Sequence, residues 1–299
     1  MNPPDPLKTC LLDILFELRD TDISPLLAGG YGLFLKQLHL QQQERTPTLI
    51  PPDAWPAPRA TNDLDVFLRA EIVAISNSMG ELAAILHRLG FVVRDSHKYM
   101  QFRRLMGGNR EVKVDLLVGP LGVHFDPTRV TVQDWRVKPR PSAKLHARRT
   151  DEAIAIEDEP TAIPISGVLS SGADYSTAVL VPQAFPYLMM KLLAFHDHER
   201  KDPGCDKARH HALDLYRVVA MLTHAEFTAA RTLRAAHEEN PYVADAASVV
   251  RDAFSEEVAT GALRVREHPH FIAAMNVEEF LATLAEIFLT PGSDEHRAS

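Results

Sequence analysis

The sequence has little cysteine, no long hydrophobic run and no excess of positive charge. Its 299 residues include two cysteines, Cys10 and Cys205, which are too few and too widely spaced to indicate a disulfide framework. No apolar segment approaches the roughly 20 residues that a membrane-spanning helix needs. The N-terminal segment MNPPDPLKTC lacks the pattern of a signal peptide. These absences predict a cytoplasmic protein without a membrane partner.

The charge balance is acidic, with a formal net charge of −8 at pH 7. A protein that coats nucleic acid through charge alone is expected to be basic, so the sequence argues against such a coat. It remains compatible with an enzyme that has a locally basic cleft, because basic residues cluster in Arg94–Arg110 and Arg136–Arg149. A hydrophobic content of 45% is typical of globular proteins and excludes a largely disordered chain.

The hydrophobic pattern divides the chain into two halves. We predict an α+β fold, with a mixed sheet and helices in residues 1–181 and an all-helical domain in residues 182–299. Residues 44–58 contain five prolines and are expected to form a loop that serves either as a lid or as an interaction surface. The predicted helices are residues 7–20, 31–43, 71–89, 185–199, 207–223, 225–239, 244–260 and 277–289. The predicted strands are residues 63–68, 91–94, 99–104, 111–118, 161–169 and 177–181.

Three aspartates on predicted strands are candidate metal ligands. Asp63 and Asp65 are two residues apart, so their side chains share one face of a strand. Two neighbouring carboxylates repel each other unless a cation lies between them, and Mg²⁺ favours such oxygen ligands. Asp115 lies in the apolar strand EVKVDLLVG, where a carboxylate is costly unless it is paired or binds metal. The alternatives are a solvated strand edge for the first two, and for Asp115 an ion pair with Lys113 or an arginine.

A glycine pair precedes the second predicted helix. Gly29 and Gly30 follow a short apolar segment, so backbone N–H groups at the helix start can approach a phosphate. The simpler alternative is a tight turn in which glycine provides a positive φ angle.

Together, these segments resemble a known family. AGGYGLFLKQ, RATNDLDVF and EVKVDLLVG resemble the Gly-Gly helix start, the D-x-D pair and the later strand acid of the nucleotidyltransferase superfamily. The segment Arg59–Asp65 looks most like the R-x-[ST]-x-D-[IL]-D motif of AbiEii/AbiGii-type toxins. Residues 191–194 and 214–216 are similar to the helical K-L-x-A and D-L-Y motifs of those toxins. The resemblance covers about residues 26–222.

The resemblance implies a polymerase-beta-like nucleotidyltransferase domain followed by a helical domain. It implies transfer of a nucleoside monophosphate from an NTP, with Mg²⁺ or Mn²⁺ as cofactor, to RNA such as a tRNA 3′ end, and opposition by a cognate antitoxin. By the resemblance, Asp63, Asp65 and Asp115 bind metal and Thr61 contacts phosphate. Lys191 would neutralise phosphate, and Asp214 would lie near Lys191 and orient it. The chain departs from the family pattern at Tyr31, where a small or polar residue is frequent, and in the long spacing between Gly30 and Asp63.

Other functions remain open at this point. One alternative is nucleotidylation of a small molecule or a protein hydroxyl, and another is a regulatory module that binds nucleotide without catalysis. The basic segment Tyr99–Arg110 either clamps nucleic acid, with Phe102 stacking beside Arg103 and Arg104, or protects a strand edge with charge. A zinc site is a further alternative, formed by His196, His198, Cys205 and His210. The spacing of these residues along the sequence matches no closed structural zinc pattern.

Overall fold

The structure is a computed structural model that describes residues 5–43, 46–58, 61–94, 99–107, 110–122 and 125–289. The chain forms two compact units. The first unit consists of Met1–His39, Ala60–Asp151 and Ile156–Pro182, and the second of Leu40–Arg59, Glu152–Ala155 and Gln183–Ser299. A single cut in the sequence therefore does not separate the units. Within the described residues, every helix is too short or too polar to cross a bilayer.

The first unit is built on one mixed sheet. Its strand order is β6-β7-β8-β5-β2-β1-β10-β9, and β4 pairs with both β5 and β3. The strands are β1 (Leu26–Ala28), β2 (Asp63–Leu68), β3 (Val92–Val93), β4 (Gln101–Met106), β5 (Arg110–Val118), β6 (Val130–Gln133), β7 (Arg136–Pro139), β8 (Ala147–Arg149), β9 (Thr161–Val168) and β10 (Asp174–Val181). The fold is thus α+β, as predicted, and three strands between residues 130 and 149 were not foreseen.

Strand β5 changes its neighbour partway along one edge. Its first part, up to Asp115, pairs antiparallel with β4, and its last residues, Leu117 and Val118, pair parallel with β8. Its other edge pairs parallel with β2 along the whole of that strand. The sheet therefore branches beside Asp115, where β4 begins and β8 takes over.

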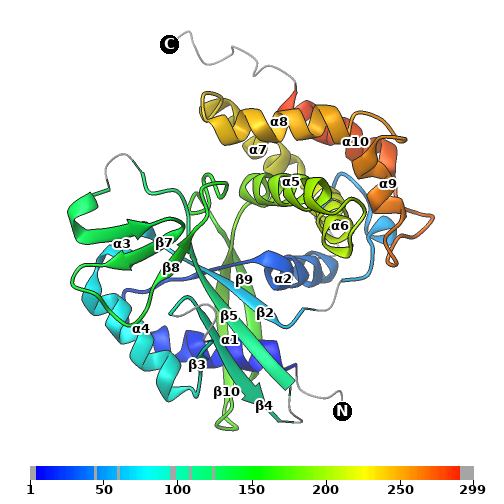
Figure 1. Cartoon of the computed structure of the whole chain (residues 1–299). Coiled ribbons are helices and arrows are strands. Elements are labelled where there is room, and N and C mark those ends of the chain that lie inside the picture. Colours follow the sequence, from blue (N-terminus) through cyan, green and yellow to red (C-terminus); the bar gives the residue numbers. More distant parts are fainter. Residues whose placement is uncertain are drawn as a thin grey trace, which may run out of the picture. The chain divides into compact units, whose positions relative to one another are not determined.

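Helices cover one face of this sheet. Helix α1 (Pro6–Leu18) packs across β2, β5, β9 and β10 and beside α4 (Ser76–Arg88), as Figure 1 shows. Alternate residues of β5 are buried, which gives the strand one apolar face: Val112, Val114, Leu116 and Val118. Helix α2 (Gly29–Gln42) follows β1 directly, as the glycine pair predicted.

The helix predicted at residues 71–89 is two helices, α3 (Ala70–Ala74) and α4. Ile75 adopts an extended conformation with φ −98° and ψ 106°, so it ends α3 and precedes α4. A β-branched residue favours this conformation more than a helical one, and the apolar periodicity continues across it. Periodicity alone therefore concealed the break.

The second unit is helical apart from the proline-rich segment. Its helices are α5 (Ala184–Lys201), α6 (Asp206–Ala220), α7 (His224–Ala236), α8 (Pro241–Ala253), α9 (Thr260–Arg266) and α10 (Val277–Phe288). The helix predicted at residues 244–260 ends at Ala253, and α9 was not predicted. The tail beyond residue 289 lies outside the described residues.

The proline-rich segment packs onto the helices of its own unit. Ile50, Ala54 and Trp55 are buried, and the carbonyl of Ala54 accepts a hydrogen bond of 3.1 Å from the Tyr216 hydroxyl. The backbone N–H of Leu49 donates to the carbonyl of Leu222 over 2.8 Å. These apolar side chains complete the core of the second unit, and the role of the segment as a lid or an interaction surface stays a prediction for its exposed residues.

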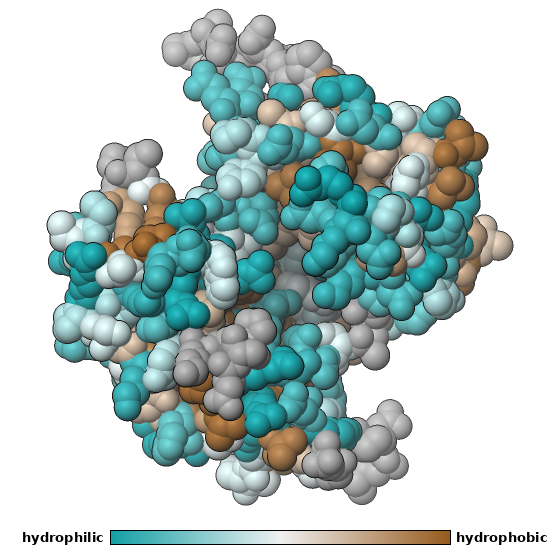
Figure 2. Space-filling view, in the orientation of Figure 1, coloured by the Kyte–Doolittle hydropathy of each residue, from teal (hydrophilic) through white to brown (hydrophobic). Residues whose placement is uncertain are grey.

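Exposed hydrophobic side chains are dispersed on the face shown in Figure 2, where hydrophilic residues separate them into small groups. Single exposed hydrophobic residues are normal in globular proteins. Among the largest exposed ones, Trp135 stands out because it lies at the tip of the β6–β7 hairpin, in the two-residue turn Asp134–Trp135. Its surroundings are part of the candidate site.

Candidate functional site

Asp63, Asp65 and Asp115 lie on one face of the sheet. Strands β2 and β5 are parallel neighbours, in which Asp65 is paired with Asp115 and Asp63 with Lys113. Because side chains alternate between faces and paired residues point to the same side, all four side chains share a face. The opposite face of the two strands holds the buried apolar residues. The structure thus places the three acids on the same face of two adjacent strands, and their role as metal ligands stays a prediction.

Gly29 fits closely beneath Asp65. Its backbone has φ +62°, and a Cβ atom added there would lie 1.7 Å from Oδ2 of Asp65. Ala28 is also the strand partner of Asp65, so β1 delivers the glycine to this position. Positive φ and lack of space both require glycine, and the start of α2 therefore lies against an acid of the candidate site. The turn that requires glycine is therefore also the point at which the start of α2 contacts Asp65.

Asp63 forms an ion pair with its strand partner. Nζ of Lys113 lies 3.3 Å from Oδ1 of Asp63, an oxygen that accepts no hydrogen bond within the described residues. The backbone N–H of Asp63 donates to the Thr61 hydroxyl over 3.3 Å. Thr61 itself borders a separate cavity of about 330 Å³. The sequence paired Lys113 with Asp115 as an alternative, but the register gives it to Asp63.

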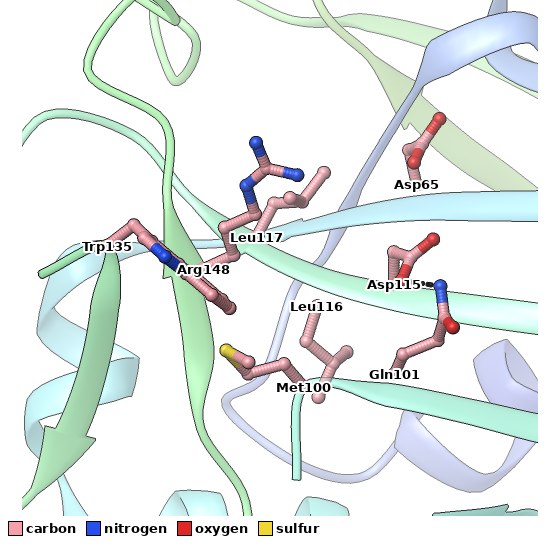
Figure 3. A pocket seen from close by; sticks show the side chains of 8 residues that line it. All are labelled: Asp65, Met100, Gln101, Asp115, Leu116, Leu117, Trp135 and Arg148. Atoms are coloured by element: carbon pink, nitrogen blue, oxygen red, sulfur yellow. Dashed lines mark hydrogen bonds between the residues drawn. The ribbon is translucent and has the colours of Figure 1, made fainter. Parts of the chain in front are cut away.

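Asp65 and Asp115 border a cavity of about 300 Å³ (Figure 3). The cavity lies at the branch of the sheet, where Met100 and Gln101 of the β4 side meet β5. Nε2 of Gln101 donates a hydrogen bond of 2.6 Å to Oδ1 of Asp115. This bond fixes the orientation of the Asp115 carboxylate at the edge of the cavity.

Arg148 and Trp135 line the other side of the cavity, opposite the two carboxylates (Figure 3). Arg148 belongs to β8 and is the strand partner of Leu117, so it shares the face of the acids. The guanidinium carbons of Arg136 and Arg148 lie 5.8 and 5.9 Å from the Trp135 ring centroid. Sequence reasoning missed these residues individually, although the basic cluster Arg136–Arg149 contains both arginines.

The neighbouring cations also act on a buried histidine. Burial, together with the positive charges of Lys138 and Arg136, lowers the pKa of His146 to about 4. His146 is therefore neutral at pH 7, and its backbone N–H donates to the carbonyl of Tyr99 over 2.8 Å. The β7–β8 region thus concentrates positive charge beside the cavity.

Phe102 is not available for stacking, contrary to one of the alternatives for the segment Tyr99–Arg110. Its ring is buried, and Arg104 donates a hydrogen bond of 2.7 Å to the buried Asp13. Arg103 is exposed and pairs with Glu111 across the hairpin. Strand alternation places Phe102 on the core face, so this segment does not form the proposed clamp. Gly108 and Asn109 of its turn lie outside the described residues.

Lys191 and Asp214 form a buried ion pair within the second unit. Nζ of Lys191 lies 2.8 Å from Oδ2 of Asp214, and Nη1 of Arg217 lies 3.2 Å from Oδ1 of the same carboxylate. Asp214 is 0% exposed and the Arg217 side chain is 1% exposed. The predicted charge pair between Lys191 and Asp214 is therefore present, and Arg217, which the sequence did not single out, completes a buried triad.

The remaining motif residues have structural contacts. Tyr31, at the unusual position of the glycine helix, is buried and donates a hydrogen bond of 2.7 Å to Asp5, the N-cap of α1. Burial and the Asp5 carboxylate raise the pKa of Tyr31, so the hydroxyl stays protonated. Gly30 lies in the first turn of α2. Arg59 of the motif lies outside the described residues.

The donor set at the cavity suits a hard divalent cation. Carboxylates are the ligands that Mg²⁺ and Mn²⁺ prefer, and Asp65 and Asp115 supply them from paired positions on adjacent strands. Oδ1 of Asp63 is buried and accepts no hydrogen bond within the described residues. Within the described part of the chain, no three Asp, Glu, His or Cys side chains come together as a metal site. The acids therefore fit a cation that substrate phosphates help to hold.

Comparisons with known proteins show little similarity to this chain. No protein-family model and no curated protein matches the sequence. The chain is similar to the solved structure of the antibiotic-resistance factor ANT(2'')-Ia, with 12% identity over 78% of this chain and 98% of that one. The TM-score of 0.32 is too low to establish a shared fold, so this likeness carries no argument about function.

Proposed function

We propose that this protein is a metal-dependent nucleotidyltransferase that moves a nucleoside monophosphate from an NTP to an acceptor. One observation carries the proposal: Asp65 and Asp115 are partners on adjacent parallel strands, and the glycine start of a helix lies directly against Asp65. Carboxylates for a divalent cation and backbone N–H groups for a phosphate are what phosphoryl transfer requires. The motif resemblance joins the same residues.

Several residues of the first unit have specific roles in this proposal. Asp65 and Asp115, with Asp63, would hold Mg²⁺ or Mn²⁺, which when bound supplies charge neutralisation and activation of the attacking oxygen. The N-terminus of α2, beginning at Gly29, orients the triphosphate through its N–H groups and its dipole. Gln101 holds the Asp115 carboxylate in place through their 2.6 Å hydrogen bond. Lys113 limits the repulsion between acids by pairing with Asp63.

We propose RNA, and in particular a tRNA 3′ end, as the acceptor, with a toxin-like role opposed by an antitoxin. The motif resemblance supports this finer proposal, and the positive charge of β7 and β8 beside the cavity is consistent with it. Transfer to a small molecule or a protein hydroxyl is the second candidate. It is favoured by the modest size of the cavity, about 300 Å³, which a small acceptor would fill.

Lys191 is proposed to bind NTP phosphate, a role that rests on the motif resemblance. Its ammonium already pairs with Asp214, so Asp214 would orient it. Lys191→Met is expected to raise the KM for NTP or lower the rate. Unchanged kinetics in a folded variant would leave Lys191 with a packing role alone.

The test of the proposed function is transfer of label from each α-labelled NTP to total RNA, with Mg²⁺ and the full-length protein. The wild-type chain is expected to label one class of RNA. Asp65→Asn and Asp115→Asn should reduce labelling by at least about 100-fold, because they remove charge stabilisation of the transferred phosphate. Thermal unfolding should show that both variants remain folded.

The matched control is Asp126→Asn, since Asp126 is exposed and, among the described residues, its side chain pairs with Thr128 and Arg129 of its own turn. This variant should label RNA as the wild type does. Undiminished labelling by Asp65→Asn would remove the metal-binding role of the acids. Label found on protein or on a small molecule would favour the second candidate.

A further inference from the structure

The parts of the candidate site follow one another across neighbouring strands of the sheet. The glycine start of α2 follows β1, the acids lie on β2 and β5, and Arg148 lies on β8, with β1, β2, β5 and β8 as successive neighbours. The phosphate-binding helix start and the Trp135–Arg148 wall therefore lie on opposite sides of the carboxylates. In Figure 3, Trp135 and Arg148 lie on one side of the cavity, and Asp65 and Asp115 lie on the other.

The geometry of phosphoryl transfer predicts which side of the acids each substrate occupies. The attacking and leaving oxygens lie roughly in line on opposite sides of the transferred phosphorus. If the helix start holds the pyrophosphate that leaves, the attacking hydroxyl approaches from the other side of the acids. That side is the wall formed by Trp135 and Arg148, so the wall faces the acceptor.

Trp135 is a rigid and accessible stacking surface. It is 46% exposed, although a tryptophan side chain normally gains from burial. Its carbonyl accepts a hydrogen bond of 2.7 Å from the backbone N–H of Arg149, and the flanking residues Gln133 and Arg136 are paired. The turn is therefore held on both sides, and stacking on the indole would cost little conformational entropy.

The cations of the wall are available to an anion. Within the described residues, neither Arg136 nor Arg148 forms an ion pair with a carboxylate, and both lie over the Trp135 ring. Arg149, by contrast, turns toward Asp151 and pairs with it over 2.9 Å. Two arginines beside an exposed aromatic ring match a nucleotide, which offers a base to stack and a phosphate to bind.

We propose that Trp135 and Arg148 form an acceptor subsite that holds the terminal nucleotides of a nucleic acid strand. This inference rests on the proposed function and names its acceptor. The base of a terminal nucleotide stacks on Trp135, and the adjoining phosphate pairs with Arg148, assisted by Arg136. A polycationic small acceptor is disfavoured by the same arginines.

The transfer that this subsite serves is balanced in atoms and charge. A terminal ribose hydroxyl oxygen bonds to the α-phosphorus of the NTP, and the bond from that phosphorus to the bridging oxygen breaks. Pyrophosphate leaves with the bonding electrons, and the hydroxyl proton passes to solvent. The strand gains one nucleotide.

Binding can be measured without any reaction because the sequence has two tryptophans, Trp55 and Trp135. Trp55 is buried, and Trp55→Phe leaves Trp135 as the single tryptophan. We expect a single-stranded hexanucleotide RNA, added without metal or NTP, to quench the Trp135 fluorescence. A DNA hexanucleotide of the same sequence is the second arm. Equal quenching by DNA would support the subsite and place RNA selection elsewhere.

Variants in the wild-type background test the two contacts by the anisotropy of a labelled RNA hexanucleotide. Trp135→Leu should weaken binding at least about fivefold, and Trp135→Phe should retain part of the affinity, because stacking persists. Arg148→Gln should weaken binding and reduce the slope of log K against log salt by about 1. The control is Arg88→Gln on α4, an exposed arginine paired with Glu17, which should bind as the wild type does.

Three outcomes would overturn the subsite. Trp135→Leu and Arg148→Gln could bind RNA as tightly as the wild type does, Arg88→Gln could weaken binding equally, or the wall variants could raise the KM for NTP and leave RNA binding unchanged. Failure of the proposed function is distinguishable from all of these. In that case the wild type would transfer no label to any acceptor, while Trp135-dependent binding of the hexanucleotide would persist.

Discussion

The two units each bring acids and bases together, but they place them in opposite surroundings. In the second unit, Asp214 is fully buried between Lys191 and Arg217, and both of its oxygens are engaged. In the first unit, Asp65 and Asp115 border a cavity opposite Arg148. A buried, internally paired charge network fixes a fold, whereas charges that face a cavity can be neutralised by a ligand. The comparison distinguishes a carboxylate that is fully buried and internally paired from two carboxylates that border a cavity.

The largest expected effect on stability is at Asp214. Asp214→Asn leaves Lys191 and Arg217 buried without a counter-charge and should lower the free energy of unfolding by about 3–5 kcal/mol. Urea denaturation measures this loss. The double variant Lys191→Met/Asp214→Asn should lose less than the sum of the single variants, because one unpaired charge is removed with its partner.

The corresponding substitution in the first unit is expected to affect stability much less. Asp115→Asn should change the free energy of unfolding by no more than about 0.5 kcal/mol, because that carboxylate lies at a cavity and not in the core. Equal stability losses for Asp214→Asn and Asp115→Asn would break the distinction between the two ionic groups.

A smaller effect is expected at Gly29. Gly29→Ala forces a residue with a Cβ into a left-handed conformation and against the Asp65 carboxylate, and should cost about 1–3 kcal/mol. Transfer activity should fall as well, since Asp65 must move. Thermal unfolding and the labelling assay measure both effects.

Gly80→Ala is the matched control for this substitution. A Cβ at Gly80, within α4, would meet no atom within 4 Å, and alanine there should stabilise the helix by about 0.5–1 kcal/mol. If Gly29→Ala were as well tolerated as Gly80→Ala, the close fit between the helix start and Asp65 would be refuted.

A further expected effect is the pH dependence of stability that His146 contributes. Its pKa is about 4 in the folded protein, below its ordinary value of 6.5, because of burial and the cations Lys138 and Arg136. The unfolded chain therefore binds the proton first, and stability falls as pH drops from 6.5 toward 4. His146→Gln should remove about 1–2 kcal/mol of this loss between pH 7 and pH 5. Urea midpoints across this range measure it, and the exposed His87 provides the control variant, His87→Gln. An unchanged pH slope in His146→Gln would contradict the prediction.

Much of the fold could be predicted because its signals are local. Strand β2 begins at Asp63 and ends at Leu68, as the alternation predicted, and the change to helices at Pro182 follows the change of period. Strand β8, in contrast, is three residues long, Ala-Arg-Arg, and exists because it pairs with the end of β5. No local pattern reveals a strand that depends on a distant partner.

The same limit applies to the candidate site. The shared face of Asp63 and Asp65 follows from a spacing of two, and a buried strand around Asp115 follows from its apolar neighbours. The pairing of Asp63 with Lys113 depends on parallel register, which the sequence of neither strand specifies alone. Trp135 was missed for a related reason, since its place beside Arg148 arises only when β7 pairs with β8.

The branch at β5 has a consequence for how this protein could diversify. The acids and the helix start are built from β1, β2 and the first part of β5, whereas Trp135 and Arg148 come from the later hairpin and β8. The two groups of elements meet only at the end of β5. The hairpin and β8 can therefore be exchanged by recombination or loop grafting while the elements that carry the acids are kept. Under the proposed function, a lineage could thus acquire a new acceptor subsite while the acids and the helix start stay unchanged.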